Sequence, residues 1–437
     1  MRQKYNILPN LQFRNRLTVP DCKLISDGRI KGYIRFGHYA REIDIVRSNE
    51  ISNDQILVSQ NIIEELNIPT ASNYEIRFDG IDITIGPYIG ILVCKRQENL
   101  DLVVQNLSNY LYDYDDIGGL VIAFSQEGID IEKEMIKGYA YNPQSTLWEE
   151  GTFYYPSSIF RRAGLSDKKR NFLHSRLGDR MFNNYIFDKW EMHKWLSNSM
   201  QHHLPETIRY ENPKDIIWFL SRFNTAYIKP IYGSQGMGIM KVTRENDIYK
   251  LEAQVDNKDI VKYFETDSKL MTHLKGYHKN KRYIIQEGID VIKKDNMMID
   301  FRVLLVKNYS GKWTEMGIIG RYGEKARITS NISSGGNASM GNEVLRDILN
   351  LTEEQILKLR SKMKKMVIEA AEKIESCGIH CGNFGFDIAI DKNYKLWIIE
   401  INNKDPNHTI AIDAGNRELF YKTKKMNMLY AKKLAGF

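Results

Sequence analysis

Residues 385–403 read GFDIAIDKNYKLWIIEINN and contain two β-type runs separated by the turn DKNYK. Asp387 lies in the first run, and Glu400 and Asn402 lie in the second. Residues two apart on a strand share a face, so Glu400 and Asn402 point the same way, and hairpin pairing brings Asp387 alongside them. Such hard oxygen donors suit Mg²⁺, which substrate phosphates help to bind. An acidic residue in an apolar strand costs desolvation energy without a cation, and the hairpin therefore predicts a magnesium site.

A second informative stretch is TAYIKPIYGSQGMGIMKV, residues 225–242, which predicts two strands joined by a glycine-rich turn. Lys229 lies inside the apolar first strand, and the glycines of the turn allow backbone N–H groups to point at phosphate oxygens. The loop is neither a Walker loop nor a dinucleotide fingerprint, because no GK[ST] closes it and no helix is expected after it. We therefore expect Lys229 and the loop to face a nucleoside triphosphate. The alternative is a plain β-hairpin with a solvent-facing lysine.

The run YIIQEG, residues 283–288, indicates a buried strand that ends in Gln286 and Glu287. Backbone groups and a carboxylate at the end of such a strand can meet an adenine amino group and a ribose hydroxyl. The alternative is an ordinary strand that stops at a glycine. A role in nucleotide binding is favoured here only because the other motifs are also present.

Basic residues lie in strand-like contexts near these segments. Arg302 lies in DFRVLLV, Arg321 lies in GRYGEKARI, and Arg327 and Asn331 precede the loop SSGGNAS. Arginine near acidic ligands is suited to bidentate binding of a phosphoryl group or a carboxylate, whereas any one of these residues alone could form a surface ion pair. Together they predict a charged, phosphate-filled cleft.

The bulk composition predicts a globular protein of two or three domains, because the chain has 437 residues, of which 42% are hydrophobic and 27% charged. No uncharged apolar run approaches the roughly 18 residues of a membrane span, and the charged start lacks a signal-peptide core. Four cysteines are too sparse for a disulfide framework. We therefore expect a cytoplasmic protein without a membrane span. The net charge of +7 is spread among interleaved acidic residues, which argues against a nucleic-acid partner.

The pattern along the chain predicts three regions of an α/β (α+β) protein. Residues 1–95 alternate short β-type runs with turn residues and predict a small β-rich domain with one helix at Gln60–Leu66. Residues 96–205 alternate helix-type and strand-type runs, which is typical of an open α/β domain. Residues 206–437 contain the motifs described above.

The motif order YIKP, glycine loop, QEG, DFR, Ser-Asn with Gly-Gly, FDIAI and EIN resembles the ATP-grasp superfamily between about residues 200 and 420. The whole chain is similar to the YheC/YheD family, the endospore coat-associated ATP-grasp proteins of spore-forming bacteria. The segments ITIGPYIGIL, FYYPSSIFRR and FDKWEMHKWL support this similarity. The resemblance implies an ATP-grasp domain in the C-terminal half, preceded by a pre-grasp α/β domain, and a place in the mother-cell cytoplasm or on the spore coat.

The resemblance also implies roles for single residues. Lys229 would contact the ATP phosphates, and Lys189 matches the lysine that many ATP-grasp proteins supply from just before the grasp domain. Arg302 would steady the reacting phosphate. The metal set Asp387, Glu400 and Asn402 would hold two Mg²⁺ ions, with Glu400 bridging them. The other implied nucleotide-binding positions are Ser234, Gln235, Gly236, Met237, Gly238, Gln286, Glu287, Gly288 and the backbone of Ile289.

The stretch ARITSNISSGGNAS is similar to the Arg-Ser-Asn and Gly-Gly segment of ribosomal-protein glutamate ligases. That similarity implies that Arg327 and Asn331 lie near an acyl phosphate. Two residues intervene between Arg327 and Ser330 in this chain, which leaves Arg321 as the alternative arginine.

The function implied by the resemblance is that of an ATP-dependent carboxylate–amine ligase, which forms an amide or peptide bond through an acyl phosphate in spore coat or envelope biogenesis. Its partners would be a small-molecule or peptide carboxylate and an amine, with spore-coat proteins and a second copy of the chain as further expectations. One alternative is a structural spore-coat protein that keeps the ATP-binding fold without turnover. Another is an ATP-dependent kinase that stops at the phosphorylated product, which product analysis would separate from ligation.

Cys377, His380 and Cys381 have the spacing of half a zinc site. A second pair is missing because Cys22 and Cys94 are isolated in the sequence, and we therefore expect no zinc.

Overall fold

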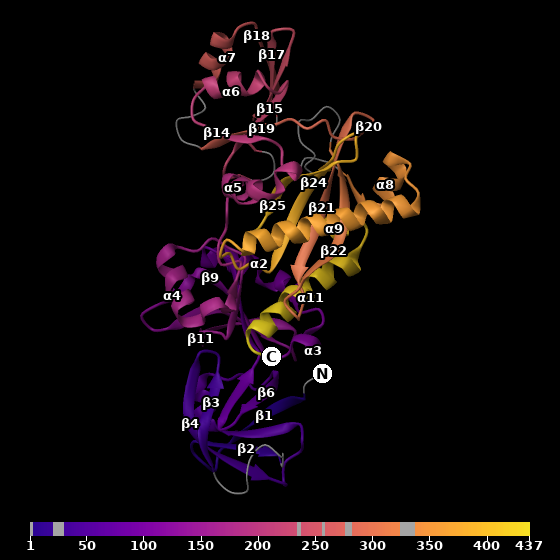
Figure 1. Ribbon diagram of the computed structural model, residues 1–437. Helices are drawn as coiled ribbons and strands as arrows, with labels where there is room; N and C mark the ends of the chain where they lie inside the picture. Colours follow the sequence, from indigo (N-terminus) through magenta and orange to yellow (C-terminus); the bar gives the residue numbers. More distant parts are fainter. Residues whose placement is uncertain (1–2, 21–29, 234–236, 256–257, 276–281, 324–336) are drawn as a thin grey trace.

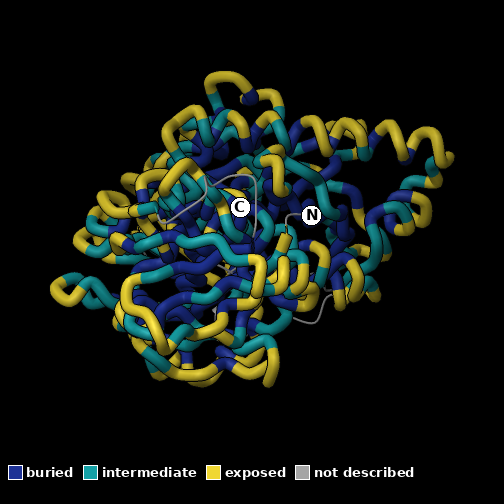
Figure 2. The backbone as a smooth tube through the Cα atoms, turned by 90° about the horizontal axis from the view of Figure 1, so that it is seen from below, coloured by how far each residue is buried: buried dark blue, intermediate teal, exposed yellow. Residues whose placement is uncertain are grey.

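The computed structural model of the chain describes residues 3–20, 30–233, 237–255, 258–275, 282–323 and 337–437. Its modules follow one another along a long axis, with a barrel at one end and a small sheet at the other (Figure 1). Buried backbone is concentrated in the interior of the molecule, and exposed backbone lies in the outer helices and turns (Figure 2).

The first module is a closed barrel whose strands pair in the order β1-β5-β2-β4-β3-β7-β6. Burial alternates along β3, where Ile34 and Phe36 point into the barrel and their neighbours are exposed, as the two-residue period of a strand requires. The barrel elements are β1 Lys4–Asn10, β2 Arg16–Pro20, β3 Ile30–Phe36, β4 Tyr39–Ser48, β5 Gln55–Ser59, α1 Gln60–Leu66, β6 Asn73–Asp79 and β7 Asp82–Gly86. Helix α1 has the bounds expected from the sequence.

Strand β8, Tyr88–Cys94, does not belong to the barrel, although we expected the first domain to reach residue 95. The barrel ends with Gly86, and β8 pairs in parallel with β9 and β12 of the next sheet. Residues Tyr88–Leu92 are buried on both faces of the strand, which is typical of a parallel strand covered on two sides. A run without alternation therefore marks the start of the second module.

The second module is an open sheet with the strand order β11-β10-β9-β8-β12-β13. Strands β9, β8, β12 and β13 run parallel to one another, so their carboxyl ends lie at one edge of the sheet. Its further elements are α2 Gln97–Val103, η1 Val104–Tyr110, α3 Tyr114–Ile117, β9 Leu120–Asp130, β10 Met135–Asn142, β11 Leu147–Tyr154, β12 Ser158–Arg161, α4 Asp167–Leu177, η2 Gly178–Arg180 and β13 Met181–Phe182.

Helix α5, Lys189–Met200, leads from this module to the next and begins with a capping box. The Asp188 side chain accepts a hydrogen bond from the Glu191 N–H at 2.8 Å, and the Glu191 carboxylate accepts one from the Asp188 N–H at 2.9 Å. Both bonds satisfy backbone donors that a helix start leaves free. This cap fixes the position of Lys189, the first residue of the helix.

The third module is a small sheet with the strand order β14-β19-β15-β16-β17-β18. Ile228 and Ile285 of this sheet pack against helices α6 and α7 through Phe219 and Leu270. Lys229 therefore points to the opposite face. The elements are η3 Gln201–His203, β14 Thr207–Tyr210, α6 Lys214–Leu220, β15 Thr225–Pro230, β16 Met240–Glu245, β17 Ile248–Val255, β18 Lys258–Phe264, α7 Asp267–Leu274 and β19 Tyr283–Glu287.

The fourth module is a larger sheet with the order β23-β22-β21-β24-β25, and β20 pairs with β21 beside it. One face packs on the long helix α9, which runs across the sheet in Figure 1. On the other face, Leu304 and Ile319 pack on α10 and α11. The elements are β20 Lys293–Lys294, β21 Met297–Lys307, β22 Trp313–Tyr322, β23 Asn337–Met340, α8 Gly341–Leu349, α9 Glu353–Glu375, β24 Asn383–Ile390, β25 Leu396–Asn402, α10 Ile410–Asp413 and α11 Arg417–Leu434.

Helix α11 ties the modules together. It runs from the large sheet toward the barrel in Figure 1. Its residues Met428 and Ala431 pack against the open sheet of the second module, called the central sheet below. The Ser158 hydroxyl of β12 donates a hydrogen bond to the Ala431 carbonyl at 2.8 Å. Lys432 forms a buried ion pair with Glu75 of the barrel. One helix therefore contacts three of the four modules.

Candidate functional site

A row of charged residues occupies one face of the large sheet. Antiparallel pairing places Asp300 opposite Arg321, Arg302 opposite Asp387, and Asp387 opposite Glu400. Residues directly opposite one another share a face, and Arg302 lies two residues after Asp300. The same face is apolar farther along β21, where Leu304 packs under α11. The charged part therefore begins where the helical cover ends.

Asp387 is the centre of this row. Arg302 donates two hydrogen bonds to its carboxylate, from Nε at 2.5 Å and from Nη2 at 3.2 Å, and Arg321 Nη2 lies 3.1 Å from Oδ2. Burial alone would raise the pKa of Asp387, but the two guanidinium groups outweigh it and hold the pKa below its usual value. Asp387 is therefore a carboxylate at neutral pH, although only 8% of its surface is exposed.

Arg321 joins a second carboxylate to the row. Its Nε and Nη2 atoms each lie 2.5 Å from an oxygen of Asp300. Burial opposes the charge of Arg321, whereas Asp300 and Asp387 favour it, and the net effect raises its pKa. Arg321 therefore stays charged between two acidic residues. Such a bidentate fork also suits an incoming carboxylate or phosphoryl group.

Lys189 connects the large sheet with the glycine-rich loop. Its Nζ lies 3.0 Å from Glu400 Oε1 and donates a hydrogen bond of 3.0 Å to the Gly233 carbonyl. The side chain of Glu400 remains 31% exposed, so the pair borders on solvent. Lys189 therefore lies between the candidate metal ligand and the candidate phosphate loop.

Lys229 faces the same place from the small sheet. Its Nζ donates a hydrogen bond of 2.5 Å to Gln286 Oε1, and Gln286 Nε2 donates one of 3.2 Å to the Thr207 hydroxyl. Burial is the main cause that lowers the pKa of Lys229, which is about 8; Lys189 also lowers this pKa, whereas Glu400 and Asp387 raise it. Because Lys189 contacts both Glu400 and the Gly233 carbonyl, the charged face of the large sheet lies next to the loop that follows Lys229.

The end of β19 is held against β14 and β15. The Glu287 N–H donates to the Glu206 carbonyl at 2.9 Å, and the Glu287 carboxylate accepts from the Glu206 N–H at 3.1 Å. A Cβ added to Gly288 would lie 2.5 Å from Thr225 Cγ2, so only glycine fits this approach. Ile289 is half-buried, and its carbonyl accepts from the Val291 N–H at 3.0 Å. Gln286 to Ile289 thus form an ordered strand end beside Lys229.

Part of the expected site lies outside the described residues. Ser234, Gln235 and Gly236 of the glycine loop do so, and so do Arg327 and Asn331. Of the loop, Met237 is 69% exposed, and Gly238 has a positive φ of 75°. Arg321, the alternative to Arg327, is described and lies in the charged row together with Arg302.

The donors near Asp387 match a metal that phosphate oxygens help to bind. The described residues contain no group of three or more His, Cys, Asp and Glu side chains arranged around a metal position. Asp387 and Glu400 are nevertheless direct neighbours across β24 and β25, and the Asn402 amide donates to the Gly385 carbonyl at 3.4 Å. Two carboxylates and one amide oxygen fit Mg²⁺, which is usually held by one or two carboxylates and the substrate phosphates.

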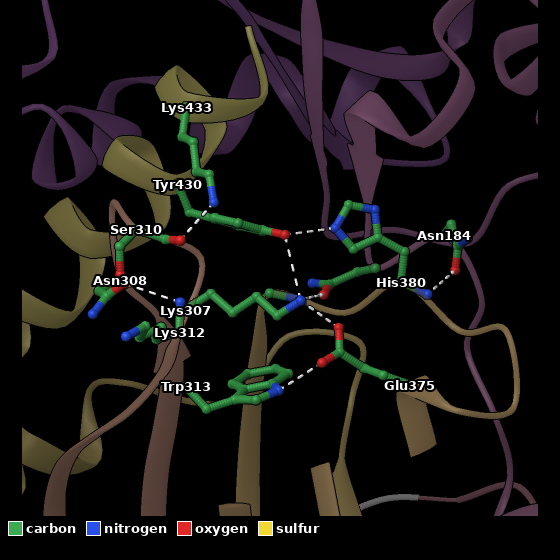
Figure 3. A network of polar contacts seen from close by, with 12 residues as sticks. Asn184, Lys307, Asn308, Ser310, Lys312, Trp313, Glu375, His380, Tyr430 and Lys433 are labelled. Atoms are coloured by element: carbon green, nitrogen blue, oxygen red, sulfur yellow. Dashed lines mark hydrogen bonds and ion pairs between the residues drawn. The ribbon is translucent and has the colours of Figure 1, made fainter. Parts of the chain in front are cut away.

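Cys377, His380 and Cys381 do not converge as zinc ligands. His380 Nε2 lies 2.7 Å from the Tyr430 hydroxyl, Cys377 is exposed and Cys381 is buried. Figure 3 shows the network around His380, in which Lys307 contacts Glu375 and Tyr430, and the Trp313 indole donates to Glu375. This network joins β21, α9 and α11 and has a structural role.

A separate group of polar residues near the charged row was not expected from the sequence. Arg162 forms an ion pair with Asp405, 243 positions away, and His408 and Lys424 lie beside them. The stretch DPNHT that follows EINN carried no motif, and a pair so distant in sequence leaves no local pattern.

The chain belongs to an ATP-grasp family. The family model described as YheC/D like ATP-grasp matches residues 178–434, which include every described residue of the charged row. Helix α5 and the sheets of the third and fourth modules fall within this match.

Individual relatives agree with this family. Endospore coat-associated protein YheD of Bacillus subtilis is 26% identical over 395 residues, which cover 87% of this chain and 86% of that protein. Endospore coat-associated protein YheC of the same organism is 23% identical over 70% of this chain and 86% of its own length. A probable alpha-tubulin polyglutamylase, Ttll1 of Tetrahymena thermophila, is 24% identical over 52% of this chain and 59% of that protein.

Among solved structures, the ATP-grasp ligase PsnB in complex with a phosphomimetic variant of its minimal precursor, Mg and ADP is similar. It shares 13% identity and covers 80% of this chain and 99% of its own, with a TM-score of 0.46.

Within the described part of the chain, none of the helices combines the length and the apolarity that a bilayer crossing requires.

Proposed function

We propose that the chain is an ATP-dependent carboxylate–amine ligase that forms an amide or peptide bond. The observation that carries this proposal is the row Asp300, Arg321, Asp387, Arg302 and Glu400 on one face of the large sheet, opposite Lys229 on the small sheet. Membership of an ATP-grasp family supports it, as does the similarity to a probable polyglutamylase.

In this proposal, ATP lies between the two sheets. Lys229 and Lys189 bind its phosphates, the glycine loop including Ser234 to Gly238 covers them, and the strand end from Gln286 to Ile289 holds the adenosine. Asp387, Glu400 and Asn402 would hold Mg²⁺, which neutralises phosphate charge when bound.

The reaction would proceed in two displacements. An oxygen of the substrate carboxylate attacks the γ-phosphorus of ATP, the bond to the β-phosphate oxygen breaks, and ADP leaves. The amine then attacks the acyl carbon, loses a proton and releases inorganic phosphate. Arg302 and Arg321 would balance the charge of the phosphoryl and acyl oxygens, with Arg327 and Asn331 as further candidates, so that positioning and charge supply the catalysis.

The test is ADP release from Mg-ATP by the purified protein, with and without pools of amino acids and of cell-wall or coat peptides. Ligation predicts ADP formation that depends on the pool and a product whose mass equals acid plus amine less water. ATP binding without any turnover would favour a structural spore-coat protein that keeps the fold. Absence of both would contradict a nucleotide site.

The biological setting of the ligase would be the spore coat or envelope, because YheD and YheC are named as endospore coat-associated. We propose a peptide or amino-acid substrate, cytoplasmic action in the mother cell, and coat proteins as partners. The barrel is proposed to recognise an acceptor or a coat partner.

A further inference from the structure

A second group of charges lies at the boundary between the central sheet and the loop that follows β25. Arg162 follows β12 directly, at the edge where the carboxyl ends of the parallel strands meet. Its Nε lies 3.2 Å from Asp405 Oδ1 and its Nη2 lies 2.7 Å from Oδ2. Such an edge is where open α/β sheets bind ligands, and the two-point contact is the geometry by which arginine binds carboxylates.

Lys424 of α11 adds a second positive charge. Its Nζ lies 4.3 Å from the ring centre of Tyr110 and 4.5 Å from that of Phe420, and Arg162 lies 5.0 Å from the same Tyr110 ring. In the described part of the chain, Lys424 has no carboxylate within ion-pair distance, whereas Lys425 lies 2.5 Å from both Asp113 and Asp116. The cluster therefore holds two cations and one carboxylate.

His408 adds an unused polar atom. Only 4% of its surface is exposed, and its Nε2 has no hydrogen-bond partner among the residues that the structure describes. Burial is the main cause that lowers the pKa of His408, which is about 3; Asp405 acts in the opposite direction, and Lys424, Arg162 and Arg302 lower this pKa as well. A neutral imidazole can donate one hydrogen bond, and an unpaired buried nitrogen calls for a partner.

The same loop reaches the acidic row. Pro406, between Asp405 and His408, packs beside Arg302, because a Cβ added to Gly385 would lie 3.0 Å from Pro406 Cβ and 3.2 Å from Arg302 Cδ. Asn402, a candidate metal ligand, lies at the start of the loop. A molecule that reached from Arg302 along this loop would meet Arg162 and Lys424.

We propose that Arg162, Lys424 and His408 bind a carboxylate of the amino-acid or peptide substrate, in the position that Asp405 takes in the structure. This carboxylate anchors the substrate and does not react. The inference rests on the proposed function, which supplies the second, reacting carboxylate or the amine near Arg302. The excess positive charge indicates an anion, and the two-point contact of Arg162 indicates a planar carboxylate.

The test compares probes that differ in one group. Binding of amino acids and dipeptides, and of the same compounds carrying a C-terminal carboxamide, is measured by calorimetry on the full chain. Asp405→Asn removes the competing charge and keeps the shape of the loop. We expect this variant to bind the carboxylate form of at least one probe about tenfold or more tightly than the amide form, and more tightly than the wild type does. Equal affinities, including no measurable binding of either form, would overturn the proposal.

Variants of the cations complete the test. Arg162→Met in the Asp405→Asn background should remove the preference for the carboxylate, and Lys424→Met should weaken it. Lys422→Met is the matched control, because Lys422 is exposed on the same helix and should leave the preference intact. A preference that survives Arg162→Met would assign Arg162 and Asp405 a structural role instead.

Mg-ATP binding, measured in the same variants, separates this proposal from the proposed function. We expect Mg-ATP affinity to be unchanged by Arg162→Met, because Arg162 contacts none of the proposed nucleotide-binding residues in the described chain. A wild type that binds no Mg-ATP would contradict the proposed ligase, while the comparison of carboxylate and carboxamide would still decide whether this site exists. Thermal unfolding of each variant checks that it is folded.

Discussion

Glu400 stands between Lys189 and Asp387, and its charge is the simplest feature of the site to remove. Glu400→Gln keeps the shape of the side chain but weakens any magnesium site and leaves Lys189 without its ion pair. We expect ADP formation from Mg-ATP to fall about 100-fold or more. A coupled ADP assay measures this, with Glu369→Gln on the exposed side of α9 as control. Near-normal ADP formation in Glu400→Gln would contradict the assignment.

We expect the binding of Mg-ATP to depend on pH through Lys229. Its pKa of about 8 in the folded chain, against an ordinary value of 10.5, means that its charge is present at pH 7 and is lost as the pH rises through 8. We expect Mg-ATP affinity to fall between pH 7 and pH 9, and Lys229→Met to weaken binding about tenfold or more at pH 7 and to remove this pH dependence. Calorimetry at both pH values measures the effect. An unchanged affinity in Lys229→Met would mean that the strand and loop are structural.

The lowered pKa of Lys229 also makes the stability of the folded chain depend on pH. Between pH 8 and pH 10.5 the unfolded chain binds more protons at Lys229 than the folded chain does, so the contribution of this group to stability rises with pH in that window. Below pH 8 the buried charge opposes folding. Lys229→Met should therefore raise the melting temperature at pH 7, in contrast to its effect on ATP binding.

Single residues could be predicted where a local sequence pattern indicated them. Asp387, Glu400 and Asn402 were expected from two-residue spacing in a hairpin, and the structure brings them to one sheet face with Arg302. The ion pairs of Asp387 with Arg302 and Arg321 were not foreseen, because strand register decides them and a single sequence does not state register.

At the scale of elements, the start of α5 links stability to the site. Asp188→Ala removes the cap oxygen of the helix that begins with Lys189. Losing such a cap costs about 1 kcal/mol, so we expect a lower melting temperature and weaker Mg-ATP binding. Asp188→Asn keeps an oxygen acceptor and is the matched control. Equal loss of ATP affinity in both variants would show that the charge of Asp188, and not the cap, is responsible.

The elements followed the sequence most closely where periodicity was strong. Helix α1 and the strands on either side of the glycine loop, β15 and β16, lie where they were expected. Strand β8 was placed in the wrong module, because an unbroken apolar run gives the element but not its partners. The run is buried on both faces, because Ile89 and Ile91 pack with α11, more than 300 residues later in the sequence, and Tyr88 and Leu92 pack in the separate core cluster of the barrel.

At the scale of the whole molecule, the barrel and α11 depend on each other through the buried pair of Glu75 and Lys432. Deletion of residues 1–86 removes Glu75 and leaves Lys432 without its partner. Deletion also uncovers apolar residues such as Tyr88 and Leu92, which share a buried cluster with the barrel, so we expect a lower melting temperature but retained Mg-ATP binding. Complete loss of ATP binding in a folded shortened chain would show that the barrel completes the nucleotide cleft.

The arrangement of the modules was the least predictable level. The sequence motifs indicate an ATP-grasp chain, and the family match agrees. Contacts such as Arg162 with Asp405 and Lys432 with Glu75 join residues 243 and 357 positions apart. No local pattern encodes such contacts, and the proposed carboxylate site at Arg162 emerges from the folded chain alone.

The central claim is that a substrate carboxylate is phosphorylated by ATP, and the most direct test is isotope transfer. Pools of amino acids and peptides labelled with ¹⁸O in their carboxylates are incubated with the protein, Mg-ATP and the unlabelled amine pool, and the released phosphate is analysed by mass spectrometry. Attack by the carboxylate followed by amide formation leaves one labelled oxygen in the phosphate for each ADP formed. ADP accompanied by unlabelled phosphate, or no ADP with any pool, would contradict the account.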